Sequence, residues 1–216
     1  MPPIHIKICG VTNPTDARFA AECGADALGL NFYPKSPRFL SGERAIAILR
    51  ELPPFVAPVG VFVGTLDEVV KSHSHQLGLR AVQTYGEVQP SVDFFPAAYI
   101  PAFRVKDAED LDAIRQFLSV CKHCKPAAVL IDSFVAGEMG GTGHTAPWHL
   151  LAGFNPGVPL ILAGGLTPDN VADAIRQVRP WGVDVASGVE SVPGVKDPGK
   201  VRAFIQNVQA AAAELR

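Results

Sequence analysis

The feature of the sequence that most constrains its fold is a regular alternation between short apolar runs and stretches with helical periodicity. Such runs, rich in β-branched residues, are apolar on both faces, which is typical of parallel strands covered by helices. Eight candidate strands follow from this pattern: Ile4–Cys9, Ala27–Phe32, Val59–Val63, Ala81–Gln83, Ala98–Phe103, Ala127–Ile131, Pro159–Ala163 and Gly182–Ala186.

Between these runs the apolar residues recur at positions i, i+3, i+4 and i+7, which predicts helices that pack one face against a sheet. The pattern is weakest for the fourth helix, near Glu87–Phe95. Capping residues predict three helix starts, at Asn13 with Pro14, at Thr65 with Glu68, and at Thr167 with Pro168.

Eight strand–helix units fit within 216 residues without a long insertion or a Pro- or Ser-rich linker. Alternation of this kind predicts right-handed parallel βαβ units. An open doubly wound sheet is the alternative, but so compact a series favours closure. We therefore expect an α/β protein in which residues 1–216 form a single (β/α)8 (TIM) barrel domain, with its active site at the carboxyl ends of the strands.

Composition narrows the class of protein. The net charge is −2 and no basic stripe stands out, so a nucleic-acid partner is not expected. The first residues lack the features of a signal peptide, and no apolar run reaches the roughly 18 residues of a membrane span.

Four cysteines in a chain of this length do not suggest a disulfide framework, which indicates a cytoplasmic protein. Cys121 and Cys124 have zinc-like spacing but no second ligand pair, so no metal site is predicted.

Two strand ends carry candidate proton-transfer groups. Lys7 and Cys9 share one face of the first strand and Ile8 takes the other; if Ile8 faces the helices, Cys9 sits at the inner rim. A thiol at the inner rim is a base or nucleophile if nearby positive charge lowers its pKa, and otherwise a small core residue. Asp132 follows the apolar sixth strand, where partial desolvation would raise its pKa and suit it to general acid catalysis. Alternatively, Asp132 caps the following turn.

Two further sites are candidates for holding a substrate. Arg38, in a proline-stiffened loop after the second strand, could bind a carboxylate or could be a solvated loop charge. Small residues follow the seventh and eighth strands in pairs, Gly164 with Gly165 and Ser187 with Gly188. At neighbouring strand ends these pairs let backbone N–H groups approach a phosphate, which is the usual phosphate site of such barrels.

Taken together, these motifs resemble the phosphoribosylanthranilate isomerase family over nearly the whole chain. The shared segments are Lys7–Gly10, Asn31–Phe32, Ser36–Arg38, Asp132–Ser133, Gly140–Gly143, Leu162–Leu166, Pro168–Val171, Asp184–Glu190 and Pro193–Asp197. The sequence departs from the family pattern at Tyr85, where a histidine is usual, and at His144, where a lysine is common. No role is assigned to either residue.

The resemblance implies a cofactor-independent Amadori rearrangement of N-(5-phosphoribosyl)anthranilate in tryptophan biosynthesis. It assigns Asp132 as the general acid that protonates the ribose ring oxygen and Cys9 as the base that removes the proton from C2. It also assigns Arg38 to the anthranilate carboxylate, and Gly164, Gly165, Ser187 and Gly188 to the phosphate. We further hypothesise that Lys7 stabilises the Cys9 thiolate.

Three questions stay open at this point. Another phosphosugar barrel, such as a ribulose-phosphate epimerase or the histidine-pathway isomerase, is the alternative enzyme, although the latter family has a carboxylate where Cys9 stands. A catalytically silent phosphate-ligand binder is the alternative from another class. The sequence also leaves a monomer and a homodimer equally open.

Overall fold

The computed structural model describes residues 3–86, 93–121, 125–132 and 148–215. Eight parallel strands pair in chain order, and β8 pairs with β1, so the sheet closes into a barrel as the sequence predicts. The strands are β1 (His5–Cys9), β2 (Ala27–Asn31), β3 (Ala57–Val63), β4 (Ala81–Tyr85), β5 (Ala98–Arg104), β6 (Val129–Asp132), β7 (Leu160–Ala163) and β8 (Gly182–Val185).

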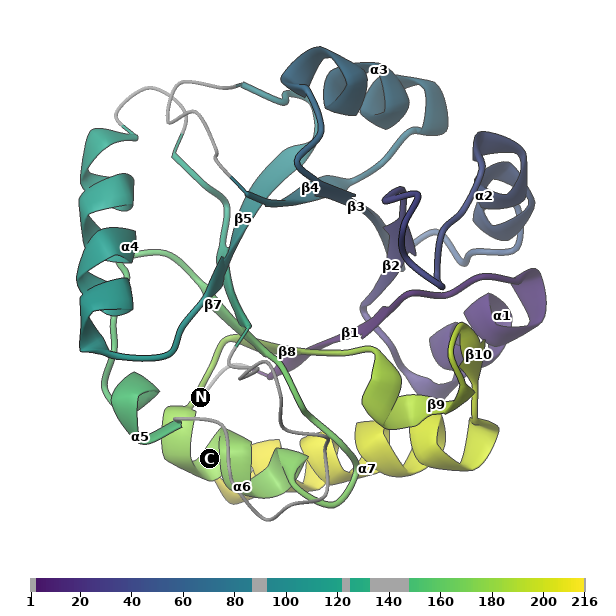
Figure 1. Cartoon of the computed structure of the whole chain (residues 1–216). Coiled ribbons are helices and arrows are strands. Elements are labelled where there is room, and N and C mark those ends of the chain that lie inside the picture. Colours follow the sequence, from purple (N-terminus) through teal and green to yellow (C-terminus); the bar gives the residue numbers. More distant parts are fainter. Residues whose placement is uncertain (1–2, 87–92, 122–124, 133–147, 216) are drawn as a thin grey trace.

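Helices surround the strands as an outer ring (Figure 1). They are α1 (Pro14–Cys23), α2 (Gly42–Leu49), α3 (Asp67–Leu77), α4 (Ala108–Val120), α5 (Trp148–Leu151), α6 (Val171–Val178) and α7 (Pro198–Glu214). Between β8 and α7 the chain forms a short 3-10 helix, η1 (Ser187–Val189), and a small antiparallel pair of strands, β9 (Glu190–Val192) and β10 (Val195–Lys196). The sequence pattern did not predict this addition.

The predicted helix starts are only partly confirmed. Asn13 caps α1, where its side chain accepts a hydrogen bond from the Asp16 N–H at 2.8 Å. Thr65 is not a cap: its hydroxyl donates to the Val63 carbonyl at 3.3 Å, and α3 begins at Asp67 without a side-chain cap. Likewise Thr167 opens a turn, and α6 begins only at Val171.

The predicted fourth helix also needs a correction. At the end of the predicted Glu87–Phe95 helix, residues 93–94 are irregular and residues 95–96 form a turn before β5. Residues 87–92 lie outside the described residues.

Strand alternation sorts the core into two layers. Side chains such as Ile8 and Ile131 lie in the layer between strands and helices, whereas Leu130, Ile161 and their neighbours fill the barrel interior. Because Ile8 faces the helices, Lys7 and Cys9 face the interior, as predicted. By the same alternation Asp132 shares the inner face of β6 with Leu130.

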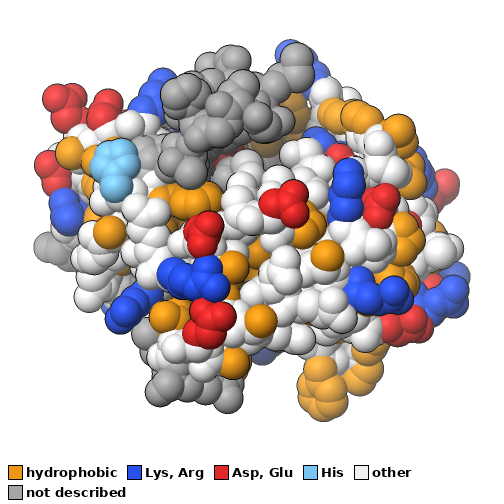
Figure 2. Space-filling view, turned by 90° about the horizontal axis from the view of Figure 1, so that it is seen from below, with side chains coloured by type: hydrophobic (Ala, Val, Ile, Leu, Met, Phe, Trp, Pro, Cys, Tyr) orange, Lys and Arg blue, Asp and Glu red, His pale blue; other side chains and the backbone are white. Residues whose placement is uncertain are grey.

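The surface carries mixed charge. On the face drawn in Figure 2, acidic and basic side chains alternate with small apolar areas and do not gather into a patch of one sign. Among the described helices, none combines the length and apolar character needed to span a bilayer.

Candidate active site

Three polar side chains lie at the carboxyl-terminal mouth of the barrel. Cys9 ends β1, Tyr85 ends β4 and Asp132 ends β6, each at an inward-facing position of its strand. Burial raises the pKa of Tyr85 well above its usual value, and the negative charges of Asp132 and Cys9 raise it further. The phenol is therefore within electrostatic reach of both predicted proton-transfer groups. The structure places Cys9 and Asp132 at the same mouth.

A buried ion pair lies beside the Cys9 sulfur. The Lys7 ammonium donates to the Asp184 carboxylate at 2.9 Å, and both side chains are almost fully closed off from solvent. Burial alone would lower the pKa of Lys7, but Asp184 and Cys9 together raise it above its ordinary value. Lys7 therefore stays protonated at neutral pH. The sequence pattern did not lead us to assign a role to Asp184, although an acid inside the otherwise apolar run Gly182–Ala186 is a signal that could have found it.

The surroundings of Cys9 raise the pKa of its thiol above the ordinary value. Burial raises the pKa of the thiol and Asp184 also raises it, while Lys7 and Lys196 lower it, with a net result above the ordinary value. We took a base role for Cys9 to require that neighbouring positive charge lowers its pKa. Two cations do lower it, but desolvation of the buried sulfur outweighs them.

Arg38 lies at the same mouth, but within an ion cluster that the sequence did not predict. Its guanidinium donates from Nε and one Nη to the two carboxylate oxygens of Glu190, at 2.7 and 2.6 Å. Lys196 also donates to Glu190, at 3.0 Å. Arg38 is therefore not a solvated loop charge, since its position is fixed by a bidentate pair.

The two predicted phosphate-binding pairs are neighbours in space. Gly164 and Gly165 follow β7 with φ angles of 87° and 63°, a backbone conformation that favours glycine. Gly188, in η1, packs so closely on the Leu166 carbonyl that a Cβ there would collide with it. Ser187 and Gly188 also line a cavity of about 430 Å³ together with Thr167 and Lys200. The turns after β7 and β8 thus form one glycine-lined edge.

Comparison with known proteins decides the family. The family described as N-(5'phosphoribosyl)anthranilate (PRA) isomerase matches residues 6–207. A protein of Trichlorobacter lovleyi named N-(5'-phosphoribosyl)anthranilate isomerase is 45% identical over 212 residues, which cover 96% of this chain and 99% of the relative. The chain belongs to the phosphoribosylanthranilate isomerase family.

Two solved structures of this family agree with the fold. One is a phosphoribosylanthranilate isomerase in complex with reduced 1-(o-carboxyphenylamino)-1-deoxyribulose 5-phosphate. It has a TM-score of 0.82 and 37% identity, and the match covers 96% of this chain and 99% of that one. The other is described as monomers of the dimeric phosphoribosylanthranilate isomerase of Thermotoga maritima, with a TM-score of 0.82, 35% identity and the same coverage.

Some family motifs lie outside the described residues, namely Ser133, Gly140–Gly143 and the divergent His144. Cys124 lies outside them as well. Within the described part of the chain, no three His, Cys, Asp or Glu side chains are grouped so that they could hold a metal ion.

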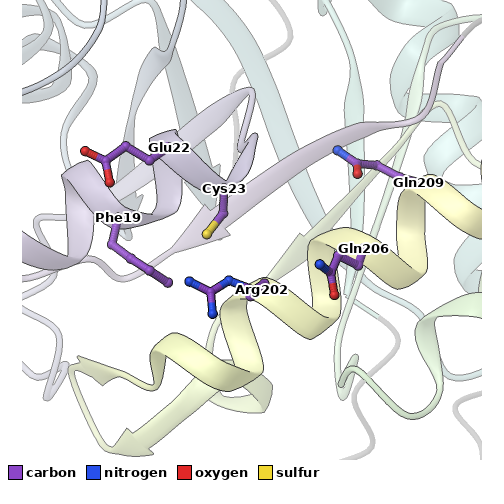
Figure 3. A pocket seen from close by; sticks show the side chains of 6 residues that line it. All are labelled: Phe19, Glu22, Cys23, Arg202, Gln206 and Gln209. Carbon is purple, nitrogen blue, oxygen red and sulfur yellow. The ribbon is translucent and has the colours of Figure 1, made fainter.

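A second cavity, of about 310 Å³, lies on the flank of the barrel between α1 and α7 (Figure 3). Phe19 and Cys23 of α1 and Arg202 of α7 point toward it. None of the seven residues predicted for the phosphoribosylanthranilate isomerase site lines this cavity.

Proposed function

We propose that Cys9 and Asp132 carry out the isomerisation of N-(5'-phosphoribosyl)anthranilate to 1-(2-carboxyphenylamino)-1-deoxyribulose 5-phosphate, in tryptophan biosynthesis. The observation that carries this proposal is the placement of a thiol and a carboxyl group, 123 positions apart in the numbering, on inward-facing positions of one barrel mouth. A glycine-lined edge suited to a phosphate lies at the same end of the strands.

The reaction needs one group that gives a proton and one that takes a proton. Asp132 donates a proton to the ribose ring oxygen, the C1–O bond breaks, and the ring opens to a protonated Schiff base at C1. The Cys9 thiolate then removes the proton from C2, and the electron pair of that bond forms an enolamine. Tautomerisation, with a proton added at C1 and one lost from the C2 hydroxyl, gives the ketose product. One group must be protonated and the other deprotonated at the same pH, so their surroundings must shift their pKa values in opposite directions.

Lys7 supports the second step in this proposal. A lysine ammonium has three N–H donors, and one of them is used on Asp184. Lys7 also donates toward the Cys9 sulfur and lowers the pKa of the thiol against the opposing effect of burial. Its charge would be most useful once the negative thiolate has formed.

Substrate binding is assigned to the remaining predicted residues. Arg38 would hold the anthranilate carboxylate, since its guanidinium is fixed at the mouth by Glu190. The N–H groups around Gly164, Gly165, Ser187 and Gly188 would hold the phosphate, because Gly164 and Gly165 turn with positive φ after β7 and Gly188 packs against the same turn.

The direct test of this function is turnover. Purified protein should consume N-(5'-phosphoribosyl)anthranilate, followed as a decrease in the fluorescence of the anthranilate group, and should leave the aminoaldose substrate of the histidine pathway unchanged. Binding of the first substrate without any consumption would indicate a silent binder. Consumption of the second substrate alone would indicate the alternative isomerase.

We also propose that the chain forms a homodimer through the amino-terminal face of the barrel. Phe55 and Phe95 are 95% and 84% exposed, and they precede β3 and β5, which flank β4, so both lie at this face. Exposed aromatic side chains at one end of a barrel are typical of an interaction surface. The relative from Thermotoga maritima is described as dimeric. Light scattering should give about twice the chain mass of 22.9 kDa, and a monomer mass would contradict the proposal.

A further inference from the structure

Glu190 lies buried between two cations at the edge of the active site. Its side chain is 4% exposed, and it accepts two hydrogen bonds from Arg38 and one from Lys196. Burial raises the pKa of Glu190, but the two cations outweigh it and lower the pKa below the ordinary value. Glu190 is therefore an anion at neutral pH, and the cluster as a whole carries one positive charge.

Lys196 ties this cluster to the backbone of the catalytic strand. Its ammonium donates to the carbonyl of Cys9 at 2.6 Å, to the carbonyl of Ala186 at 3.1 Å and to Glu190 at 3.0 Å. These three bonds use all three N–H groups of a lysine. A continuous path of hydrogen bonds therefore runs from the Arg38 guanidinium through Glu190 and Lys196 to the main chain of Cys9.

Arg38 is held from its other side by Gly10. Gly10 has a φ of 70°, and a Cβ at this position would collide with the Cδ of Arg38. The arginine side chain thus packs on the backbone directly after Cys9. Only part of its surface, 21%, is exposed. The guanidinium has little freedom to turn while Glu190 is in place.

A guanidinium has five N–H groups and two forked edges, one formed by Nε with an Nη and one formed by the two Nη atoms. Glu190 occupies the first edge. We propose that Glu190 is a positioning residue, which holds Arg38 by one forked edge so that the other edge is aimed at the carboxylate of the substrate. This inference rests on the carboxylate-binding role of Arg38 in the proposed function.

The proposal explains why a carboxylate and an arginine are paired beside a site that must itself bind a carboxylate. The cluster keeps one positive charge in excess, which the substrate carboxylate would neutralise. In the substrate that carboxylate is only a few covalent bonds from C2, where the proton is removed. Since Arg38 packs next to Cys9, a fixed guanidinium would place C2 near the sulfur.

The test is Glu190→Asp, which keeps the charge but withdraws the carboxylate by one methylene. We expect KM for N-(5'-phosphoribosyl)anthranilate to rise about tenfold, the order of one charged hydrogen bond, with a smaller change in kcat. For N-(5'-phosphoribosyl)aniline, which lacks the carboxylate, kcat/KM should match that of wild type. A merely structural role would lower activity on both substrates equally, and that result would overturn the proposal.

Two comparisons make the test specific. Glu214 makes a similar forked contact with Arg176 on the surface, at 2.9 and 3.3 Å, so Glu214→Asp is a matched control that should leave both substrates unaffected. The double variant Arg38→Met/Glu190→Asp should be no worse than Arg38→Met alone, because Glu190 acts through Arg38. A further loss in the double variant would contradict the proposal.

The outcomes also separate this inference from the proposed function. If Arg38→Met raises KM only for the substrate with a carboxylate and Glu190→Asp does not, the positioning role fails and the role of Arg38 stands. If Arg38→Met affects both substrates alike, Arg38 does not bind the carboxylate, and both proposals fail. Glu190→Gln, with the same two substrates, replaces Glu190→Asp if the shorter side chain prevents folding.

Discussion

The Lys7 ammonium donates a hydrogen bond to the Asp184 carboxylate at 2.9 Å, and the two side chains are buried together inside the barrel. They are 177 residues apart and meet because β1 and β8 pair side by side, with Lys7 opposite Asp184 in register. Cys9 follows on the same face of β1. The two members of this ion pair act on the thiol in opposite directions, because Lys7 lowers the pKa of Cys9 and Asp184 raises it.

We predict that Lys7→Met shifts the pH dependence of catalysis to higher pH. Loss of the ammonium removes the largest influence that lowers the pKa of Cys9, so the pKa rises further. The thiolate is the basic form, and at any given pH a smaller fraction of the enzyme then carries it. The rising limb of kcat/KM against pH should therefore move upward, as steady-state rates across the neutral and alkaline range would measure.

A second variant guards against loss of folding. Lys7→Met alone leaves Asp184 buried without its cation, which is strongly destabilising. The double variant Lys7→Met/Asp184→Asn removes both charges. It should still show an upward shift, because Lys7 influences the pKa of Cys9 more than Asp184 does. An unchanged limb in both variants would mean that Lys7 does not act on the thiol.

We predict that Cys9→Ala and Asp132→Asn each lower kcat by about 100-fold or more, the usual contribution of a positioned proton-transfer group. KM should change little, because neither residue is assigned to the carboxylate or the phosphate. Steady-state and single-turnover rates would measure the effect. Cys23→Ala, on α1 away from the mouth, is the matched cysteine control. Nearly wild-type kcat in either variant would remove that residue from the mechanism.

The barrel itself could be predicted from the sequence because each strand is buried on both faces and therefore stands out as an apolar run. Most strand ends were predicted to within one or two residues. The pair β9–β10 was not, because long-range contacts stabilise it. The Thr12 hydroxyl donates to the Gly194 carbonyl, and the Lys196 N–H donates to Asp16. A pattern read over a few neighbouring residues cannot indicate contacts between residues 180 or more positions apart.

The positions of Cys9 and Asp132 at one mouth of the barrel could be predicted, because each residue ends a strand. Charged residues whose role depends on a distant partner were missed. Glu190, for example, pairs with Arg38, which lies 152 residues earlier in the chain. The pKa of Cys9 could not be predicted either, since it depends on how far burial of the sulfur outweighs the nearby cations.

We predict that Gly188→Ala weakens phosphate binding and lowers stability. A Cβ at this position would collide with the Leu166 carbonyl, so the turns after β7 and β8 must separate. Overpacking of this kind costs about 1–3 kcal/mol. Urea unfolding would measure the loss of stability, and inhibition by inorganic phosphate should require a higher concentration. Gly42→Ala, where a Cβ meets no atom within 4 Å, is the control. Unchanged phosphate inhibition in Gly188→Ala would contradict the assigned phosphate site.

We predict that Gly29→Ala impairs the chemical step more than substrate binding. Gly29 lies opposite Cys9 in the β1–β2 register, and a Cβ there would be 2.6 Å from the Cys9 sulfur and 3.0 Å from the Lys7 ammonium. The thiol must therefore move away from its position, and small displacements of a reacting group are costly to the rate. We expect kcat to fall at least about tenfold with little change in KM, as steady-state kinetics would show.

Gly60→Ala separates this effect from general overpacking. Gly60 lies on the neighbouring strand β3, where a Cβ would instead press on the apolar side chains of Leu79 and Phe62. Both variants should lose stability, by about 1–3 kcal/mol. Only Gly29→Ala should lose kcat, because only its new methyl group reaches the thiol. Equal losses of kcat in the two variants would show that the rate responds to barrel packing in general and not to the position of the Cys9 sulfur.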